Sequence, residues 1–125
     1  MIHLDTSYLI RLLVPGSSED RQVRAWLREG TALGVSVIAW AEFLCGPLEP
    51  AEFDLAGQVV VERTPFTAED ALLAARLYNL AGRRRGTLVD CMIAATAIRA
   101  EAALATANPS DFHRFARGGL ELFKD

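Results

Sequence analysis

The sequence predicts an α/β fold of three layers, in which helices cover both faces of a central, mainly parallel sheet of four to five strands. Short apolar stretches of strand length alternate with longer segments in which apolar residues recur at helical spacing. Strands separated by helices pair in parallel and are covered on both faces. No linker interrupts the alternation, and 125 residues is a common domain size. We therefore expect a single domain over residues 1–125.

The first half of the chain is expected to form two strands and four helices. Pro15-Gly16 stops the first helix, and Gly30 closes the second. Ser17 with Asp20 reads as a capping box. The expected elements are strand 2–4, helix 6–14, a helix from the Ser17 cap to Glu29, strand 32–35, a helix from the Ser36 cap to Gly46-Pro47, and a short helix 51–56.

The second half is expected to add three strands and three helices. The β-branched run Val59-Val60-Val61 predicts a strand. Thr67 and Asp70 start an amphipathic helix that reaches residue 81. The remaining expected elements are a helix from Thr87 to Glu101, strands 103–106 and 120–123, and a short helix that begins at Pro109.

Composition narrows the class of protein. A content of 51% hydrophobic and 23% charged residues is typical of a soluble globular chain. The net charge of −3 argues against broad electrostatic binding to nucleic acid, which rests on basic patches. Arginine supplies twelve of the thirteen basic residues, which either GC-rich coding or phosphate recognition produces. The cluster Arg83, Arg84 and Arg85, between two glycines, is either solvated surface or a contact to backbone phosphates.

The sequence favours a cytoplasmic location. Cys45 and Cys91 lie in apolar helical surroundings without metal-ligand or disulfide spacing, so we expect both to be buried and reduced. The N-terminal segment lacks a basic region, and Asp5 interrupts its apolar stretch, which argues against a secretory signal. Residues 31–48 contain a single charge, Glu42, but glycines and a proline divide them into a short strand and a short helix. We therefore expect no membrane span.

Four acidic residues, Asp5, Glu42, Asp90 and Asp111, are the candidate catalytic residues. Asp5 and Asp111 follow expected strands, and Glu42 and Asp90 lie early on helices that start at the same edge of the sheet. Ligands bind at the carboxyl ends of parallel strands, so we expect the four acids to meet there. Carboxylates gathered in this way need a cation, and Mg²⁺ or Mn²⁺ prefers oxygen ligands. The pattern predicts metal-assisted chemistry on a phosphate substrate.

Helix capping offers a structural alternative for three of these acids. Asp5 can cap the first helix, and Asp90 can complete a capping box with Thr87. Asp111 can be the first-turn acid of a short helix that Asn108 caps and Pro109 begins.

Glu42 is the acid that capping does not explain. It lies in the most apolar helix of the chain, beside Trp40, Phe43 and Leu44. An unpaired charge is costly to bury in such surroundings, so we expect Glu42 to need a partner or a cation.

Four short motifs resemble those of the PIN-domain ribonucleases. They are Asp5-Thr6-Ser7 after the first strand, Ala41-Glu42-Phe43, Asp90-Cys91-Met92-Ile93-Ala94-Ala95, and Thr106-x-Asn108-x-x-Asp111-Phe112. Their order and spacing are similar to those of the family from residue 2 to about residue 115, and the chain length suits the VapC toxins of type II toxin–antitoxin (VapBC) systems. Residues 47–65 match no motif of the family.

The resemblance implies a PIN domain with Mg²⁺-dependent endoribonuclease activity, in which Mn²⁺ can substitute. Asp5 and Asp90 would be the principal metal ligands, and Glu42 and Asp111 would complete the pocket directly or through water. The hydrogen-bonding side chains that would orient these carboxylates are Thr6, Ser7, Thr106 and Asn108. Arg83, Arg84 and Arg85 would then be candidates for RNA binding.

The resemblance also implies two protein partners, a second copy of the chain and a cognate VapB-like antitoxin. The antitoxin would wrap the toxin and place a side chain, often arginine, in the acidic pocket. Leu12, Leu13 or Trp26 either line a groove for an antitoxin helix or belong to the core. The alternative function is a PIN-like domain that binds RNA or a protein without cleaving RNA, and the presence of all four acids favours cleavage.

Overall fold

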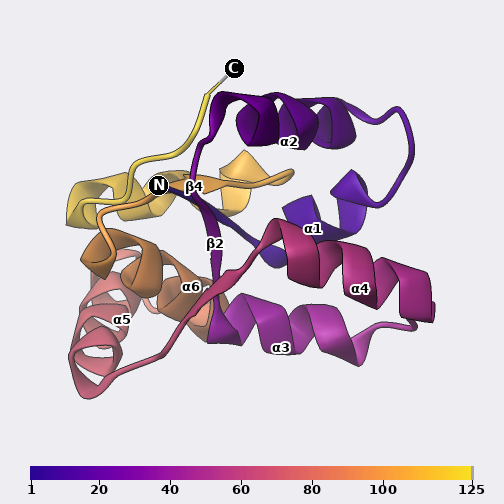
Figure 1. Cartoon of the computed structure of the whole chain (residues 1–125). Helices are drawn as coiled ribbons and strands as arrows, with labels where there is room; N and C mark the ends of the chain where they lie inside the picture. Colours follow the sequence, from indigo (N-terminus) through magenta and orange to yellow (C-terminus); the bar gives the residue numbers. More distant parts are fainter. Residues whose placement is uncertain (125) are drawn as a thin grey trace.

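The computed structural model, which describes residues 1–124, contains a four-stranded parallel sheet at its centre (Figure 1). The strands are β1 (Ile2–Leu4), β2 (Leu33–Ser36), β3 (Glu62–Thr64) and β4 (Ala103–Ala105), in the spatial order β3-β2-β1-β4. Every neighbouring pair is parallel, with Ile2 opposite both Leu33 and Ala103. The predicted α/β fold with a parallel sheet is confirmed.

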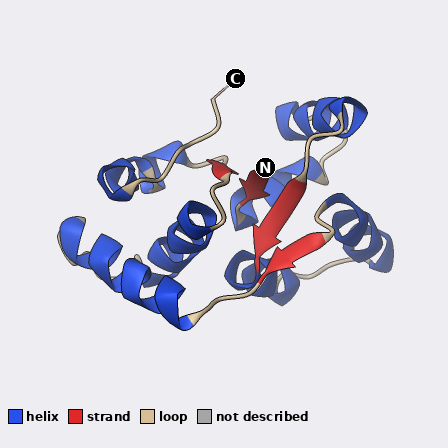
Figure 2. Cartoon of the chain, turned by 60° about the vertical axis from the view of Figure 1, so that its left-hand side comes forward, coloured by secondary structure: helices blue, strands red, loops and turns tan. Residues whose placement is uncertain are grey.

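Three helical connections join the strands. The helices α1 (Thr6–Leu12) and α2 (Ser18–Glu29) connect β1 to β2, and α3 (Val37–Cys45) and α4 (Pro50–Val59) connect β2 to β3. The third connection, α5 (Ala68–Leu80) and α6 (Leu88–Arg99), runs from β3 back to the other edge of the sheet. Right-handed crossovers in opposite directions place their helices on opposite faces. Helices accordingly flank the strands on both sides (Figure 2).

Local hydrogen bonds explain where the helices begin. Ser17 Oγ accepts from the backbone N–H of Asp20 at 3.0 Å, and Ser36 Oγ accepts from that of Ala39 at 3.0 Å. Thr67 and Asp70 form a reciprocal capping box at the start of α5. The expected caps at these starts are confirmed, although the Asp20 carboxylate accepts from the N–H of Gly16 instead of that of Ser17. The first helix ends at Leu12, two residues earlier than expected.

The prediction of a strand at residues 59–61 is wrong, because β3 lies at residues 62–64. Val59 ends α4 with its side chain in the core, Val60 is fully buried, and Val61 is 75% exposed. Val59 and Val60 therefore pack the C-terminal end of α4 against the core and do not form a strand. The strand itself is an edge strand, Glu62–Thr64, whose pairing with β2 outweighs its polar side chains.

Several other expectations also need correction. The final strand expected at 120–123 is a single bridge between Leu104 and Leu122. Cys91 is buried as expected, but Cys45 is exposed at the end of α3. Leu12 and Trp26, which could have lined a groove, are each 4% exposed and belong to the core.

Two short 3-10 helices, η1 (Pro109–Asp111) and η2 (His113–Gly118), follow β4. Phe115 of η2 is fully buried and anchors this segment to the core. Across residues 1–124, none of the helices combines the length and apolar character that crossing a membrane requires.

An ion pair between a buried carboxylate and an exposed arginine joins α5 to α6. The Asp70 side chain is fully buried and accepts hydrogen bonds from the Thr67 N–H, at 2.9 Å, and from Arg99 Nε. Arg99 also reaches Glu69 at 3.1 Å. The pair fixes the hairpin of helices that brings the start of α6 to the edge of the sheet.

Candidate functional site

The candidate site lies where the strand order of the sheet changes direction. From β1 the chain continues to β2 and β3 on one side, whereas β4 pairs with β1 on the other side. Ligands of parallel sheets bind at the carboxyl ends of strands at such a switch point. Asp5 directly follows β1, and its backbone N–H donates to the carbonyl of Ala105, at the end of β4, at 3.1 Å. The two strand ends that carry Asp5 and Thr106 are therefore held side by side.

Asp5 is a buried carboxylate, only 4% exposed. Its Oδ1 accepts a hydrogen bond from the Tyr8 N–H at 2.9 Å and from Ser7 Oγ at 2.7 Å. Asp5 is thus the N-cap of α1, as the capping alternative predicted, and it also faces the site. Burial raises the pKa of the Asp5 carboxyl, the hydroxyls of Thr106 and Ser7 and the N–H of Tyr8 offset part of this rise, and the nearby charge of Glu42 adds to it.

A small network of hydroxyl groups positions Asp5. Since Ser7 Oγ donates to Asp5, it accepts from the backbone N–H of Ala107 at 3.0 Å and lies 3.3 Å from Thr106 Oγ1. Thr106 Oγ1 accepts from the Asn108 N–H at 3.0 Å. The network ties the loop after β4 to the start of α1. Asn108 takes part through its backbone, and its side chain does not cap η1, contrary to expectation.

Glu42 is exposed on α3, so the expectation that it lies among buried apolar side chains was wrong. The apolar neighbours Ala39 and Phe43 point into the core, which leaves Glu42 on the outer side of the helix. Its Oε1 accepts a hydrogen bond of 2.6 Å from Thr6 Oγ1. Thr6 comes from the start of α1, so this bond directs the Glu42 carboxylate toward the end of β1.

Asp90 is the acid whose ionisation the surroundings disfavour most clearly. It lies half-buried in the first turn of α6. The pKa of Asp90 is raised to about 6, chiefly by burial and then by the negative charges of Asp111, Glu42 and Asp5, while the positive charge of Arg114 offsets part of the rise. The charges of Asp5, Glu42 and Asp111 therefore all act on Asp90, so the fold brings the four candidate acids to one region of the molecule. Asp111, at the end of η1, is exposed like Glu42, and its charge acts on Asp90.

The capping alternative for Asp90 is wrong. The Thr87 side chain makes no cap for α6. Its hydroxyl instead donates to the carbonyl of Arg84 at 2.6 Å. No capping box therefore compensates for the unfavourable ionisation of Asp90 in the folded protein. This favours a role for the Asp90 carboxylate in binding a ligand.

The donor set fits a hard divalent cation. Oxygen ligands are those that Mg²⁺ and Mn²⁺ prefer, and a cation would relieve the repulsion that raises the pKa of Asp90. Within residues 1–124, no three His, Cys, Asp or Glu side chains are already arranged as a metal centre. Site-bound Mg²⁺ needs only one or two carboxylates and keeps several waters, so Asp5 and Asp90 suffice as candidate ligands.

Arg114 is a residue of the site that the sequence did not single out. It lies on η2, its positive charge acts on Asp90, and its guanidinium lies 5.1 Å from the centre of the Phe115 ring. Its Nε is buried and has no hydrogen-bond partner among the described residues. Arg114 comes three residues after Asp111, but nothing in the sequence separates it from the other arginines.

The three arginines of residues 83–85 lie in the loop between α5 and α6. All three are exposed, but Arg83 and Arg85 line a cavity with Tyr78, whereas Arg84 does not line it. The cluster, expected to be either solvated surface or a contact to backbone phosphates, is thus divided, with two of its arginines at a cavity and one away from it.

The parallel α/β topology is PIN-like. The family model described as "PIN domain" matches residues 2–118, and the chain belongs to this family. No curated protein sequence matches the chain significantly.

Solved structures of toxin–antitoxin complexes share the fold. The chain is similar to one in VapBC2 from Rickettsia felis bound to a promoter DNA fragment, with 21% identity, 98% of each chain covered and a TM-score of 0.76. A toxin–antitoxin complex from Klebsiella pneumoniae gives 22% identity, 90% and 91% coverage of this chain and that one, and a TM-score of 0.73. VapBC-1 from nontypeable Haemophilus influenzae gives 22% identity, 99% and 98% coverage, and a TM-score of 0.68.

Proposed function

We propose that this single PIN domain is a VapC-type toxin, a metal-dependent endoribonuclease that a cognate antitoxin inhibits. The observation that supports the proposal is the gathering of four carboxylates at the switch point of the sheet, where burial and the charges of the other three acids together raise the pKa of Asp90. Such an arrangement is unfavourable for folding and useful for holding a cation. The solved complexes that share the fold support the toxin assignment.

In the proposed reaction Asp5 and Asp90 would hold Mg²⁺, or Mn²⁺, and Glu42 and Asp111 would complete the site directly or through water. When bound, the cation would activate water for attack and stabilise charge on the phosphodiester. Ser7 and Thr106 keep the Asp5 carboxylate oriented, and Thr6 does the same for Glu42. Cleavage leaves a 5′-phosphate and a 3′-hydroxyl. Arg114 adds a positive charge beside Asp90, where the substrate phosphate arrives.

The test uses purified protein freed from any antitoxin and a mixture of single-stranded RNAs. We expect cleavage with Mg²⁺ or Mn²⁺, none with EDTA, and none for Asp5→Asn or Asp90→Asn. Asp54→Asn, at an exposed acid on α4, is the matched control and retains activity. RNA cleaved equally well by the wild type and the two site variants would contradict the proposal, and RNA bound but never cut would favour the non-cleaving alternative.

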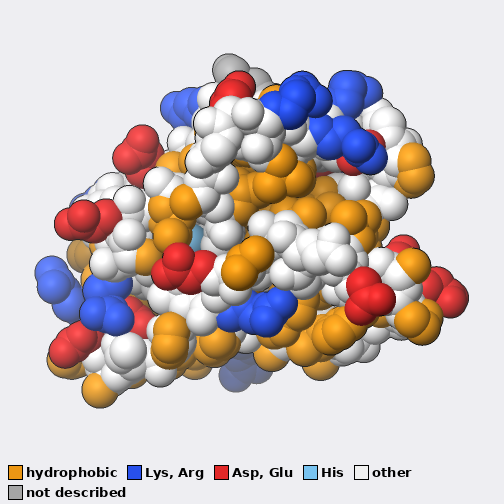
Figure 3. Space-filling model, in the orientation of Figure 1, with side chains coloured by type: hydrophobic (Ala, Val, Ile, Leu, Met, Phe, Trp, Pro, Cys, Tyr) orange, Lys and Arg blue, Asp and Glu red, His pale blue; other side chains and the backbone are white. Residues whose placement is uncertain are grey.

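An apolar groove beside Glu42 suits the proposed antitoxin. Ile10, Leu13, Val14, Phe43 and Leu48 line a cavity of about 380 Å³ together with Glu42. Ile10 and Val14 are 54% and 53% exposed, and hydrophobic side chains gather on this face of the molecule, between α2 and α4 (Figure 3). An amphipathic helix could lay its apolar face in this groove, with a basic side chain directed to Glu42. The groove uses Leu13 but not Leu12 or Trp26.

This interface is tested by co-purification with the small protein encoded beside the toxin gene. Ile10→Glu places a charge in the groove and should abolish co-purification, whereas Leu72→Glu, at a 70% exposed position on α5, should not. Retention of the partner by Ile10→Glu would place the antitoxin elsewhere. Light scattering of the free chain tests the proposed homodimer.

A further inference from the structure

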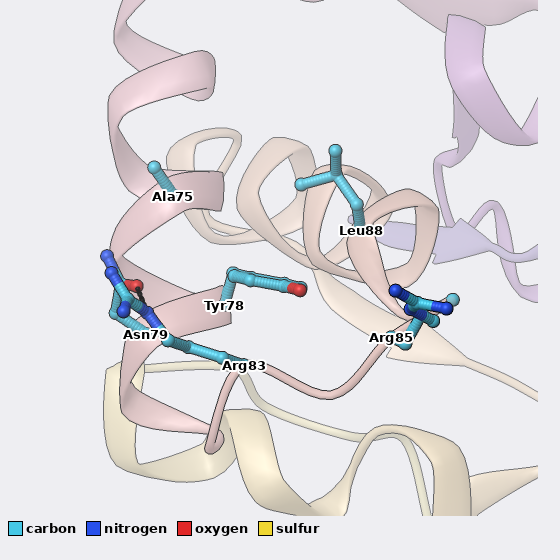
Figure 4. Close-up of a pocket in the computed structure, with 7 residues that line it drawn as sticks. Ala75, Tyr78, Asn79, Arg83, Arg85 and Leu88 are labelled. Atoms are coloured by element: carbon cyan, nitrogen blue, oxygen red, sulfur yellow. Dashed lines mark hydrogen bonds between the residues drawn. The ribbon is translucent and has the colours of Figure 1, made fainter.

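A second cavity lies between the end of α5 and the start of α6, apart from the acidic pocket. It has a volume of about 630 Å³, and its walls include Tyr78, Asn79, Arg83, Arg85 and Leu88. Figure 4 shows the Tyr78 ring extending from α5 across the cavity, with its hydroxyl toward Arg85. Arg83 folds back along α5 toward Asn79 in the same view. An aromatic ring thus lies between two guanidinium groups.

The loop that carries the arginines has a defined conformation. The backbone N–H of Arg83 donates to the carbonyl of Tyr78 at 2.9 Å, and that of Gly82 donates to Asn79 at 3.3 Å. These two bonds form a Schellman motif at the end of α5. Gly82, Arg83 and Gly86 all have positive φ angles, of 87°, 57° and 82°. An arginine at positive φ is uncommon, so the turn, and not chance, sets where Arg83 lies.

The charges of this loop are not used within the fold. Arg83 Nε donates to the Asn79 side chain at 2.7 Å, which orients its guanidinium and leaves its charge unneutralised. In the part of the chain that the structure describes, neither Arg83, Arg84 nor Arg85 has an acidic partner within 4.0 Å. Oriented cations beside a stacking surface are the features by which proteins hold single-stranded nucleic acid.

We propose that this cavity binds a nucleotide of single-stranded RNA, with its base stacked on Tyr78 and a neighbouring phosphate held by Arg85 and Arg83. The inference rests on the proposed function and adds a second contact to the RNA that the acids cleave. The helix α6 connects the two places, because Leu88 lines the cavity and Asp90 lies two residues further along the same helix. A helix is about 10–12 Å across, so one extended strand reaches both.

The occupant is RNA and not a protein helix because of the chemistry of the walls. The groove beside Glu42 has two acids, Glu42 and Glu52, among its lining residues, which would repel a phosphate backbone and attract a basic protein helix. This cavity instead combines one aromatic face with two arginines. Base stacking tolerates any base, so the cavity would hold the strand without selecting its sequence.

The experiment measures RNA binding separately from cleavage. Fluorescence anisotropy with a labelled single-stranded RNA is recorded in EDTA, in an Asp90→Asn background that cannot hold the metal. Tyr78→Leu keeps apolar packing and removes the stacking ring, and it should weaken binding about 5- to 100-fold. Tyr78→Phe retains the ring and should bind like the parent. Arg85→Ala should weaken binding and lower the slope of log affinity against log salt by about 0.7.

Arg84→Ala is the matched control, because Arg84 has the same charge in the same loop and does not line the cavity. It should change binding much less than Arg85→Ala does. Equal losses for Arg84→Ala and Arg85→Ala, unchanged binding of Tyr78→Leu, or no RNA binding by the parent would overturn the inference. Thermal unfolding confirms that each variant is folded. Cleavage by the wild type in Mg²⁺ tests the proposed function independently, so a failure of one is distinguishable from a failure of the other.

Discussion

Replacing Asp90 with asparagine removes the charge that the fold accommodates least well. Burial and the neighbouring acids raise the pKa of Asp90 from 3.8 to about 6. A raised pKa in the folded state means that folding favours the protonated form. The wild type therefore loses stability as the pH rises from about 4 to about 6, and the loss is complete above that range. The amide of the Asp90→Asn variant has no such proton to lose.

The size of the effect follows from the same pKa. A tenfold change in an ionisation constant is worth about 1.4 kcal/mol, so the full difference corresponds to about 3 kcal/mol. Asp90 is only half-buried and solvent screens part of the repulsion, which reduces the expected gain for Asp90→Asn to about 1–2 kcal/mol at pH 7.5.

Urea unfolding followed by tryptophan fluorescence measures this gain. In EDTA at pH 7.5, Asp90→Asn should be more stable than the wild type, and at pH 4 the two should converge. Adding Mg²⁺ should stabilise the wild type by RT ln(1 + [Mg²⁺]/Kd), about 2.7 kcal/mol at one hundred times its Kd, and leave the variant unchanged.

Asp54→Asn, at an exposed position on α4, provides the baseline for losing one negative charge. A variant Asp90→Asn that is less stable than the wild type at pH 7.5 in EDTA would refute the reasoning. Such a result would mean that favourable contacts hold the Asp90 carboxylate of the wild type, and that the other acids do not repel it.

Two further predictions concern buried polar groups. Burial, aided by the N-terminal charge, lowers the pKa of His3 to about 4, so its contribution to stability is full above pH 6.5 and falls as the pH drops toward 4. The difference in unfolding free energy between the wild type and His3→Gln should therefore change by about 3 kcal/mol between pH 7 and pH 4, and a pH-independent difference would contradict this. Arg99→Met leaves the Asp70 carboxylate buried without its cation and should cost about 3 kcal/mol, measured by urea unfolding. A loss no larger than that of the exposed Arg76→Met would show that the pair is dispensable.

Much of the fold was predictable because its signals are local. A serine or threonine at the N-cap accepts a hydrogen bond from the backbone N–H three residues later, in the first turn of the helix. This bond is local, and the helices that start after Ser17, Ser36 and Thr67 all have it. The alternation of helices with apolar strands then requires a parallel sheet. Two acids of the motifs were predictable for a related reason, since Asp5 follows β1 and Asp90 lies in the first turn of α6, whereas Glu42 lies in the second half of α3. Their catalytic roles stay a prediction.

The errors concern properties that depend on distant neighbours. Val59 to Val61 have the composition of a strand, but contacts of α4 with the core bury the first two, and β3 forms where the chain passes the edge of β2. Glu42 and Cys45 lie in an apolar helix whose orientation on the sheet leaves both exposed. Hydrophobic spacing indicates that a helix has a buried face, but packing decides which residues occupy it.

The class of fold, the starts of the helices and the identity of four acids could be predicted from the amino-acid sequence, because they follow from backbone hydrogen bonding and the order of short motifs. Three-dimensional packing was needed to establish that Arg114 faces Asp90, that Thr6 holds Glu42, and that Arg85 lines a cavity with Tyr78 while Arg84 does not. Some of these contacts join residues that are far apart in the sequence. Arg84 and Arg85, in contrast, are neighbours of the same residue type, and only the folded structure shows which of the two lines the cavity. No local sequence pattern encodes the distances between these charges. Only the folded chain brings Asp5, Glu42 and Asp111 close enough to Asp90 for their charges to raise its pKa.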